Sequence, residues 1–204
     1  MENTVKQTGL LEKTGVFDEE LKNRYELHLT YNGVKGKRVL VICMNPASDN
    51  IQVFDSTTNY LLNNFGMMGY SDITVWNLFS RICTKLKPSE ITDNNRNMEY
   101  LKELLQSSYD AIVISWGCTF IGNKKVEAAK KEVLELLKPF EKQVYEIVDK
   151  EGRYSKLSYT HVLFAGPVSY THLVRAAISD LAVLKYEGLK KVGDAVGNTQ
   201  AYQL

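Results

Sequence analysis

Two asparagines that could bind a small ligand stand directly after short apolar runs. Asn45 follows the run Arg38–Cys43, and Asn77 follows the run Ile73–Trp76. A carboxamide has one acceptor oxygen and two donor hydrogens, enough to hold a water molecule or to match the hydrogen-bonding edge of a nucleobase. Asparagine also ends strands as a turn residue that binds its own backbone. Both interpretations remain open for each residue.

The segment after Asn45 holds four more candidate ligand contacts. Pro46 excludes Asn45 from helical geometry, so the chain must turn sharply before Ser48. Phe54 could stack on a flat ligand or belong to the core. Asp55 could bind a ligand hydroxyl group or cap the helix that follows it.

Three later residues complete the candidate site. Arg81 could bind a phosphate group through its planar guanidinium, or form a surface ion pair. Gly117 comes just after the apolar run Asp110–Ser115, where α/β sheets bind ligands. His161 could donate a proton to developing negative charge, or be purely structural. The three histidines and three cysteines are too scattered for a metal site or a disulfide framework, so we expect neither a metal nor a cofactor.

Apolar runs and helical periodicity alternate along the chain. This alternation predicts an α/β fold, a three-layer α/β/α sandwich with a mainly parallel sheet of four to five strands. The expected strands are 38–43, 73–76, 110–115, 143–148 and 159–164. The expected helices are one from 56 that Gly66 or Gly69 ends, 94–107, 123–138 and about 170–190. We expect an N-terminal extension (1–37) that packs on the core as a short helix or an edge strand, one α/β domain (38–190) and a C-terminal tail (191–204).

Composition excludes several classes of protein. The 204 residues include 25 Lys and Arg against 24 Asp and Glu, so the chain lacks the basic excess of proteins that bind nucleic acid through bulk charge. No signal peptide and no apolar run long enough to cross a bilayer is present, which predicts a cytoplasmic protein without membrane contact. The loop motifs of P-loop nucleotidases, dinucleotide oxidoreductases and serine hydrolases are also missing from the sequence.

The order of the motifs resembles the uracil-DNA glycosylase-like superfamily. Residues 39–46, a strand that leads into Asn-Pro, are similar to the first motif of mismatch-specific and thymine-DNA glycosylases. Residues 69–84, which contain Asn77 and Arg81, resemble their second conserved stretch. The resemblance covers residues 24–165 and implies a glycosylase-like fold with a nucleobase pocket.

The chain resembles still more closely an uncharacterised bacterial and phage family with a related core. That family combines Asn-Pro-Ser/Thr, an Asp-x-Thr segment (here Asp55–Thr57), Asn-Leu, Trp-Gly and a late His-Pro-Leu. The chain departs from these patterns in two places. Ala47 stands where the glycosylases have glycine, and the late motif is His161–Leu163 without the proline.

The resemblance implies a role for several of these residues. Asn45 would position a water molecule, Phe54 would stack on the base, Asn77 would read its edge and His161 would stabilise the leaving base. The near-neutral charge and the altered late motif favour a protein that binds a nucleotide-type small ligand, for example a phage protein that sequesters a nucleotide immune signal. The alternative is a DNA glycosylase or related N-glycosidic hydrolase that acts on a flipped base, with nucleic acid as the less favoured partner. The oligomeric state stays open.

Overall fold

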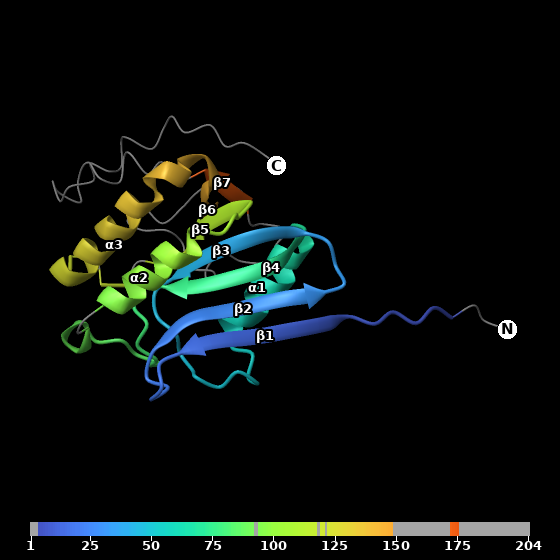
Figure 1. Cartoon of the computed structure of the whole chain (residues 1–204), viewed down its shortest axis with the longest axis horizontal. Coiled ribbons are helices and arrows are strands. Elements are labelled where there is room, and N and C mark those ends of the chain that lie inside the picture. Colours follow the sequence, from blue (N-terminus) through green and yellow to red (C-terminus); the bar gives the residue numbers. More distant parts are fainter. Residues whose placement is uncertain (1–3, 92–93, 118, 121, 149–171, 176–204) are drawn as a thin grey trace.

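The computed structural model describes residues 4–91, 94–117, 119–120, 122–148 and 172–175 (Figure 1). Within these residues, seven strands form one sheet in the order β1-β2-β4-β3-β5-β6-β7. The strands are β1 (Leu10–Phe17), β2 (Arg24–Asn32), β3 (Lys37–Cys43), β4 (Tyr70–Asn77), β5 (Ala111–Ile114), β6 (Val144–Val148) and β7 (His172–Arg175).

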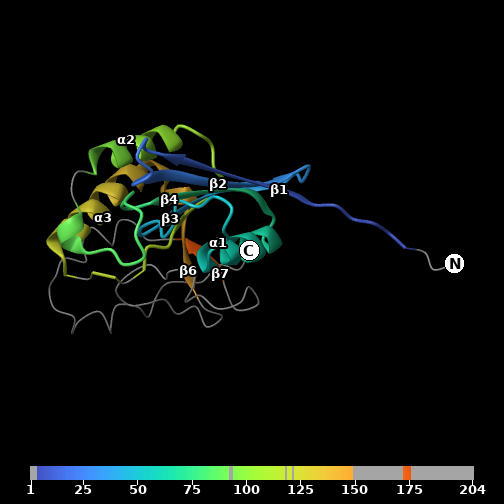
Figure 2. The same ribbon diagram turned by 90° about the horizontal axis from the view of Figure 1, so that it is seen from below.

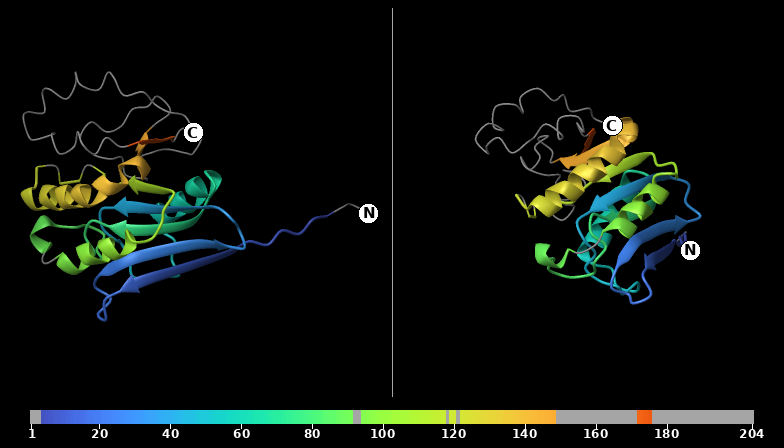
Figure 3. Two further views of the ribbon diagram at one scale, coloured as in Figure 1. Left: turned by 45° about the horizontal axis from the view of Figure 1, so that its top comes forward. Right: turned by 60° about the vertical axis from the view of Figure 1, so that its left-hand side comes forward.

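The sheet is mixed, so the prediction of a mainly parallel sheet with four to five strands was wrong. The central strands β4, β3, β5 and β6 are parallel, but β1 and β2 form an antiparallel hairpin and β2 pairs antiparallel with β4. At the other edge, β7 pairs antiparallel with β6. Figure 3 shows the hairpin along one edge of the sheet. The hairpin escaped prediction because β1 is largely exposed and carries little apolar signal.

Two further predictions concern the C-terminal part of the chain. Residues 172–175 form a strand, although their spacing of apolar residues predicted a helix from about 170. Pairing with β6 outweighs that local periodicity, because strand contacts between distant segments override weak propensity. The predicted strand 159–164 and the rest of the predicted helix lie outside the described residues.

Helices cover both faces of the sheet. The helices are α1 (Ser56–Met67), α2 (Asn95–Leu104) and α3 (Lys124–Leu137), with short 3₁₀ turns at Pro88–Glu90 and Lys138–Gln143. Side chains alternate along β3, so that Val39 and Val41 pack with α1 while Leu40 and Ile42 pack with α2 and α3. Figure 2 shows α1 and α2 on opposite sides of the sheet. A strand buried on both faces explains the unbroken apolar run that predicted it.

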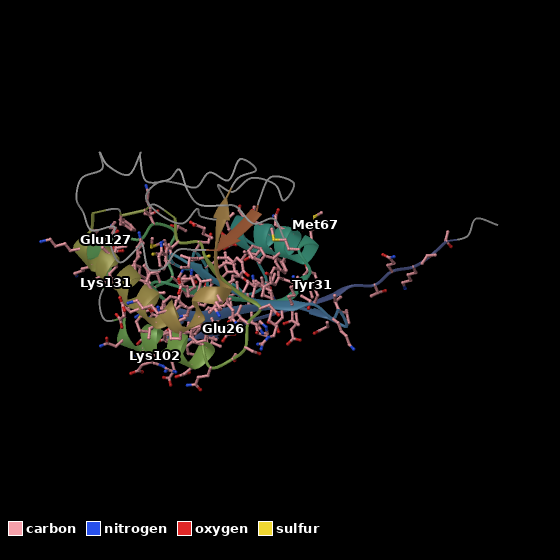
Figure 4. The ribbon with its side chains drawn as sticks, turned by 90° about the horizontal axis from the view of Figure 1, so that it is seen from above. Glu26, Tyr31, Met67, Lys102, Glu127 and Lys131 are labelled. Atoms are coloured by element: carbon pink, nitrogen blue, oxygen red, sulfur yellow. The ribbon has the colours of Figure 1, made fainter. Side chains whose placement is uncertain are left out.

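The helices begin and end close to their predicted bounds because local signals define them. The side chain of Asp55 caps α1, and that of Asn123 caps α3. Figure 4 shows Glu127 and Lys131 on the outer side of α3, opposite its buried apolar stripe. No helix among the described residues is long and apolar enough to cross a bilayer.

The connections after the parallel strands diverge at the carboxyl end of β3. The chain leaves β3 toward α1 on one face, whereas β4 and β5 lead to α2 and α3 on the other. Such divergence opens a crevice at the carboxyl edge of a sheet, where α/β proteins bind ligands. The two asparagines singled out above follow or end the strands at this edge.

Candidate functional site

A small hollow, or recess, lies between the first turn of α1 and the carboxyl ends of β3 and β4. Its volume is about 50 Å³. An apolar cavity of ~150 Å³ admits benzene, and a water molecule occupies ~30 Å³ of liquid. The hollow therefore holds water or a small polar group, and a whole nucleobase does not enter it. Its lining is Arg24, Leu27, Cys43, Asn45, Pro46, Ala47, Asp55, Thr57, Thr58, Leu61, Val75 and Asn77.

The Asn45 side chain joins two loops while it lines the hollow. Its Nδ2 atom donates to the carbonyl oxygen of Cys83 at 2.7 Å and to that of Pro46 at 3.1 Å. These bonds correspond to the turn interpretation of this residue. Its Oδ1 atom makes no hydrogen bond to the described residues. This oxygen can therefore accept a hydrogen bond from a ligand in the hollow that Asn45 lines.

Asn77 is buried at the end of β4, and it accepts hydrogen bonds from residues of β2 and α2. Its Oδ1 atom accepts a hydrogen bond from Nη2 of Arg24 at 3.3 Å. Its main-chain oxygen accepts one from Nδ2 of Asn97, at 3.0 Å, on α2. Asn97 thus fixes the strand end that carries Asn77, and the Asn77 carboxamide contacts the guanidinium.

Sequence reasoning missed Arg24, the most unusual residue of this site. The residue is only 8% exposed, and Nη1 donates to the carbonyl oxygen of Ser48 at 3.3 Å. Its Nε atom is buried without a hydrogen-bond partner, and the guanidinium makes no ion pair with a carboxylate of the described residues. Burial lowers the pKa of Arg24, and the charge of Asp55 partly offsets this effect. The result is a buried cation with only neutral acceptors.

A β-bulge directs Arg24 into the hollow. Phe17 lies opposite Arg24, but the preceding residue of β1, Val16, lies opposite Glu26, so Tyr25 is an extra residue in β2. Tyr25 and Glu26 consequently face the same way. The Tyr25 ring stacks on Tyr100 of α2, with centroids 5.8 Å apart, and Glu26 accepts a 2.6 Å hydrogen bond from the Tyr100 hydroxyl group. Arg24 therefore points to the opposite face, toward α1.

The first turn of α1 supplies the other polar wall. Oδ1 of Asp55 accepts a hydrogen bond from the Thr58 backbone nitrogen at 2.7 Å, so the capping interpretation is correct locally. Asp55 also lines the hollow together with Thr57 and Thr58. Its negative charge acts on Arg24 and on Lys13 of β1. The wall therefore combines two threonines of the first helical turn with one carboxylate-bearing residue.

Thiol chemistry is not supported at this site. Burial raises the pKa of Cys43 to about 12, although nearby Arg24 acts in the opposite direction. Burial also raises the pKa of Cys83. Because the thiolate is the reactive form, these groups stay protonated and poorly nucleophilic near neutral pH.

Several predicted site residues do not line the hollow. The Ser48 hydroxyl group accepts a hydrogen bond from the backbone nitrogen of Asn50 at 3.0 Å. The partly exposed Phe54 ring lies under Nζ of Lys13, 4.7 Å from its centroid. These residues belong to the loop that leads into α1, outside the lining.

The remaining predictions fall farther from the hollow. Arg81 is exposed, and its backbone forms an isolated bridge with Asn23. Gly117 is buried beyond β5, with a φ of 74° that favours glycine. His161 lies outside the described residues. The structure thus brings together Asn45, Pro46, Asp55 and Asn77 of the predicted set, with Arg24 as an addition.

The fold and the hollow define an α/β protein with a mixed sheet and a polar recess at its carboxyl edge. The chain belongs to the DUF1643 family, described as a protein of unknown function, whose sequence profile matches residues 24–159. This match begins at Arg24 and leaves β1 outside. No curated protein and no solved structure matches the chain.

Proposed function

We propose that this protein binds a nucleotide-type small ligand at the hollow between α1, β3 and β4. One observation carries the proposal: polar side chains from four separate segments converge there. Arg24, Asn45, Asp55 and Asn77 all line the same recess. Convergent polar groups at the carboxyl edge of an α/β sheet are typical of a ligand site.

The size of the recess decides how such a ligand would lie. About 50 Å³ takes a small polar group, so the base of a nucleotide would remain at the mouth. The half-exposed Phe54 ring, adjacent in sequence to Asp55, is then available for stacking. The idea that the ligand is a nucleotide immune signal sequestered by a phage protein remains a prediction from resemblance.

A thermal-shift panel of adenine, guanine, cytosine and uracil nucleotides, cyclic dinucleotides and the matching nucleosides tests the proposal. A ligand that binds only the folded state at ~100 times its Kd stabilises it by about 2.7 kcal/mol. Asn77→Ala should reduce the shift, whereas Asn63→Ala, at an exposed position of α1, should leave it unchanged. The absence of a shift with every compound would contradict the proposal.

The same samples separate binding from catalysis. Mass spectrometry of the incubated ligand should recover it intact if the protein only binds. Release of uracil, hypoxanthine or thymine from mismatched duplexes, lost in Asn45→Ala, would instead establish the glycosylase alternative.

A further inference from the structure

We infer that Arg24 is the anchor of a small-anion subsite, which in the proposed function takes a phosphate group of the nucleotide. The inference deepens the proposed function, but its evidence is separate. It depends on one guanidinium group that the fold buries without a direct ion pair to a carboxylate of the described residues.

The chemistry of arginine makes this arrangement unusual. A guanidinium group remains protonated in proteins and carries five N–H donors arranged to grip carboxylate or phosphate oxygens. Two of these donors reach neutral oxygens, both at 3.3 Å, and Nε is buried without a partner. Burying a charge in this way is costly unless a partner compensates it. A bound anion would provide that partner.

The surroundings of Arg24 suit an anion of phosphate size. The guanidinium and the first turn of α1, a helix of 12 residues, line the same recess. Helix N-termini attract anions through their N–H groups and the helix dipole. The hydroxyl-bearing Thr57 and Thr58 line the recess from the same turn. Cation, helix terminus and hydroxyl groups thus meet in one small space.

Asp55 opposes an anion here, and the charge balance must include it. Its carboxylate already accepts the capping hydrogen bond from Thr58. Lys13, the other cation whose charge interacts with Asp55, donates to the carbonyl oxygen of Val53 at 2.6 Å. Arg24 and Asp55 are the charged residues of the lining, and Lys13 lies outside it, although its charge interacts with both. The three groups together carry one net positive charge.

Titration of the wild-type protein with inorganic phosphate and pyrophosphate, against sodium chloride at equal ionic strength, tests the anion site directly. Both anions should raise Tm well beyond the chloride control. Arg24→Gln should weaken their affinity roughly 10- to 100-fold, because charged hydrogen bonds are lost. Arg81→Gln, which removes an exposed arginine outside the recess, should not change it.

Asn77→Asp provides a second test that keeps Arg24 in place. The new carboxylate would occupy the Oδ1 position, 3.3 Å from Nη2, and neutralise the guanidinium internally. We expect this variant to have a higher Tm than the wild type without ligand and to lose the phosphate-specific shift. This result is informative even if Arg24→Gln does not fold.

The outcomes separate this inference from the proposed function. No phosphate-specific shift in the wild type, or an undiminished shift in Asn77→Asp, would overturn the anion subsite. Binding of phosphate but of no nucleotide would support the subsite and contradict the proposed function. Nucleosides that bind as tightly as their nucleotides would leave the proposed function intact and refute the role of Arg24.

Discussion

Each face of the sheet carries an ionisable side chain that is withdrawn from water near the carboxyl edge: Arg24 is buried, and Glu146 is partly buried. Arg24 of β2 lies on the α1 face, in the recess. Glu146 of β6 lies opposite Ile114, on the face covered by α2 and α3. Neither side chain forms an ion pair with the described residues.

The difference follows from proton chemistry. Burial raises the pKa of Glu146 to about 7, so this carboxyl group can take up a proton and become neutral. Arginine has no such option near neutral pH. The partly buried Glu146 therefore needs no partner below pH 7, whereas the buried Arg24 remains charged and gains from an external anion. This contrast marks Arg24, and not Glu146, as a ligand contact.

The largest effect that we expect to test this contrast is a pH dependence of the free energy of unfolding, caused by Glu146. Its pKa is raised above the ordinary 4.5, so the folded state binds the proton more tightly. The stability from this group is complete below pH 4.5 and is lost as pH rises through 7, by up to about 3 kcal/mol. Urea unfolding from pH 5 to 8 should show this loss, and Glu146→Gln should flatten it. Glu141→Gln, at an exposed position, serves as the control, and equal slopes in all three proteins would contradict the prediction.

A smaller effect should come from removing the charge of Arg24 in the absence of ligand. Arg24→Met keeps most of the buried stem and removes a buried cation that forms no ion pair with the described residues. We expect the free energy of unfolding in chloride buffer to rise by about 1–2 kcal/mol, as when buried ions are replaced by apolar groups. Arg81→Met should change it little. A fall of ~1 kcal/mol or more in urea unfolding would show that Arg24 is a structural residue.

The smallest effect separates the two roles of Asp55. Asn caps helices as well as Asp does, so Asp55→Asn should keep stability within ~0.5 kcal/mol. By removing the opposing charge, it should raise phosphate affinity a few-fold in calorimetry. Asp55→Ala should also raise affinity but lose about 1 kcal/mol of stability with the cap. Unchanged affinity in both variants would place the anion away from this carboxylate.

Local signals predicted the helices and the central strands well. The run 38–43 corresponds to β3, and the helix predicted at 123–138 corresponds to α3. Strands buried on both faces and capped amphipathic helices carry their pattern in adjacent residues. The resemblance implied a nucleobase pocket, whereas the hollow that Asn45 and Asn77 line is smaller than a base and does not include Phe54.

Local sequence patterns did not predict the β1–β2 hairpin or the position of Arg24. Simple alternation along β2 would place Arg24 on the same face as Glu26, away from α1. The bulge at Tyr25 reverses this assignment, and only pairing with β1 reveals it. Sequence spacing likewise left Phe54 and Arg81 as candidate contacts, whereas the chain path places both outside the lining.

The order of apolar runs, caps and turn residues determined the α/β character of this protein and put Asn45 and Asn77 at strand ends, because those patterns act over a few neighbouring residues. Only the tertiary structure decided that the sheet is mixed and that Arg24 faces the recess. Strand register, bulges and the burial of a charge arise from contacts between distant segments, and no local stretch of sequence contains them.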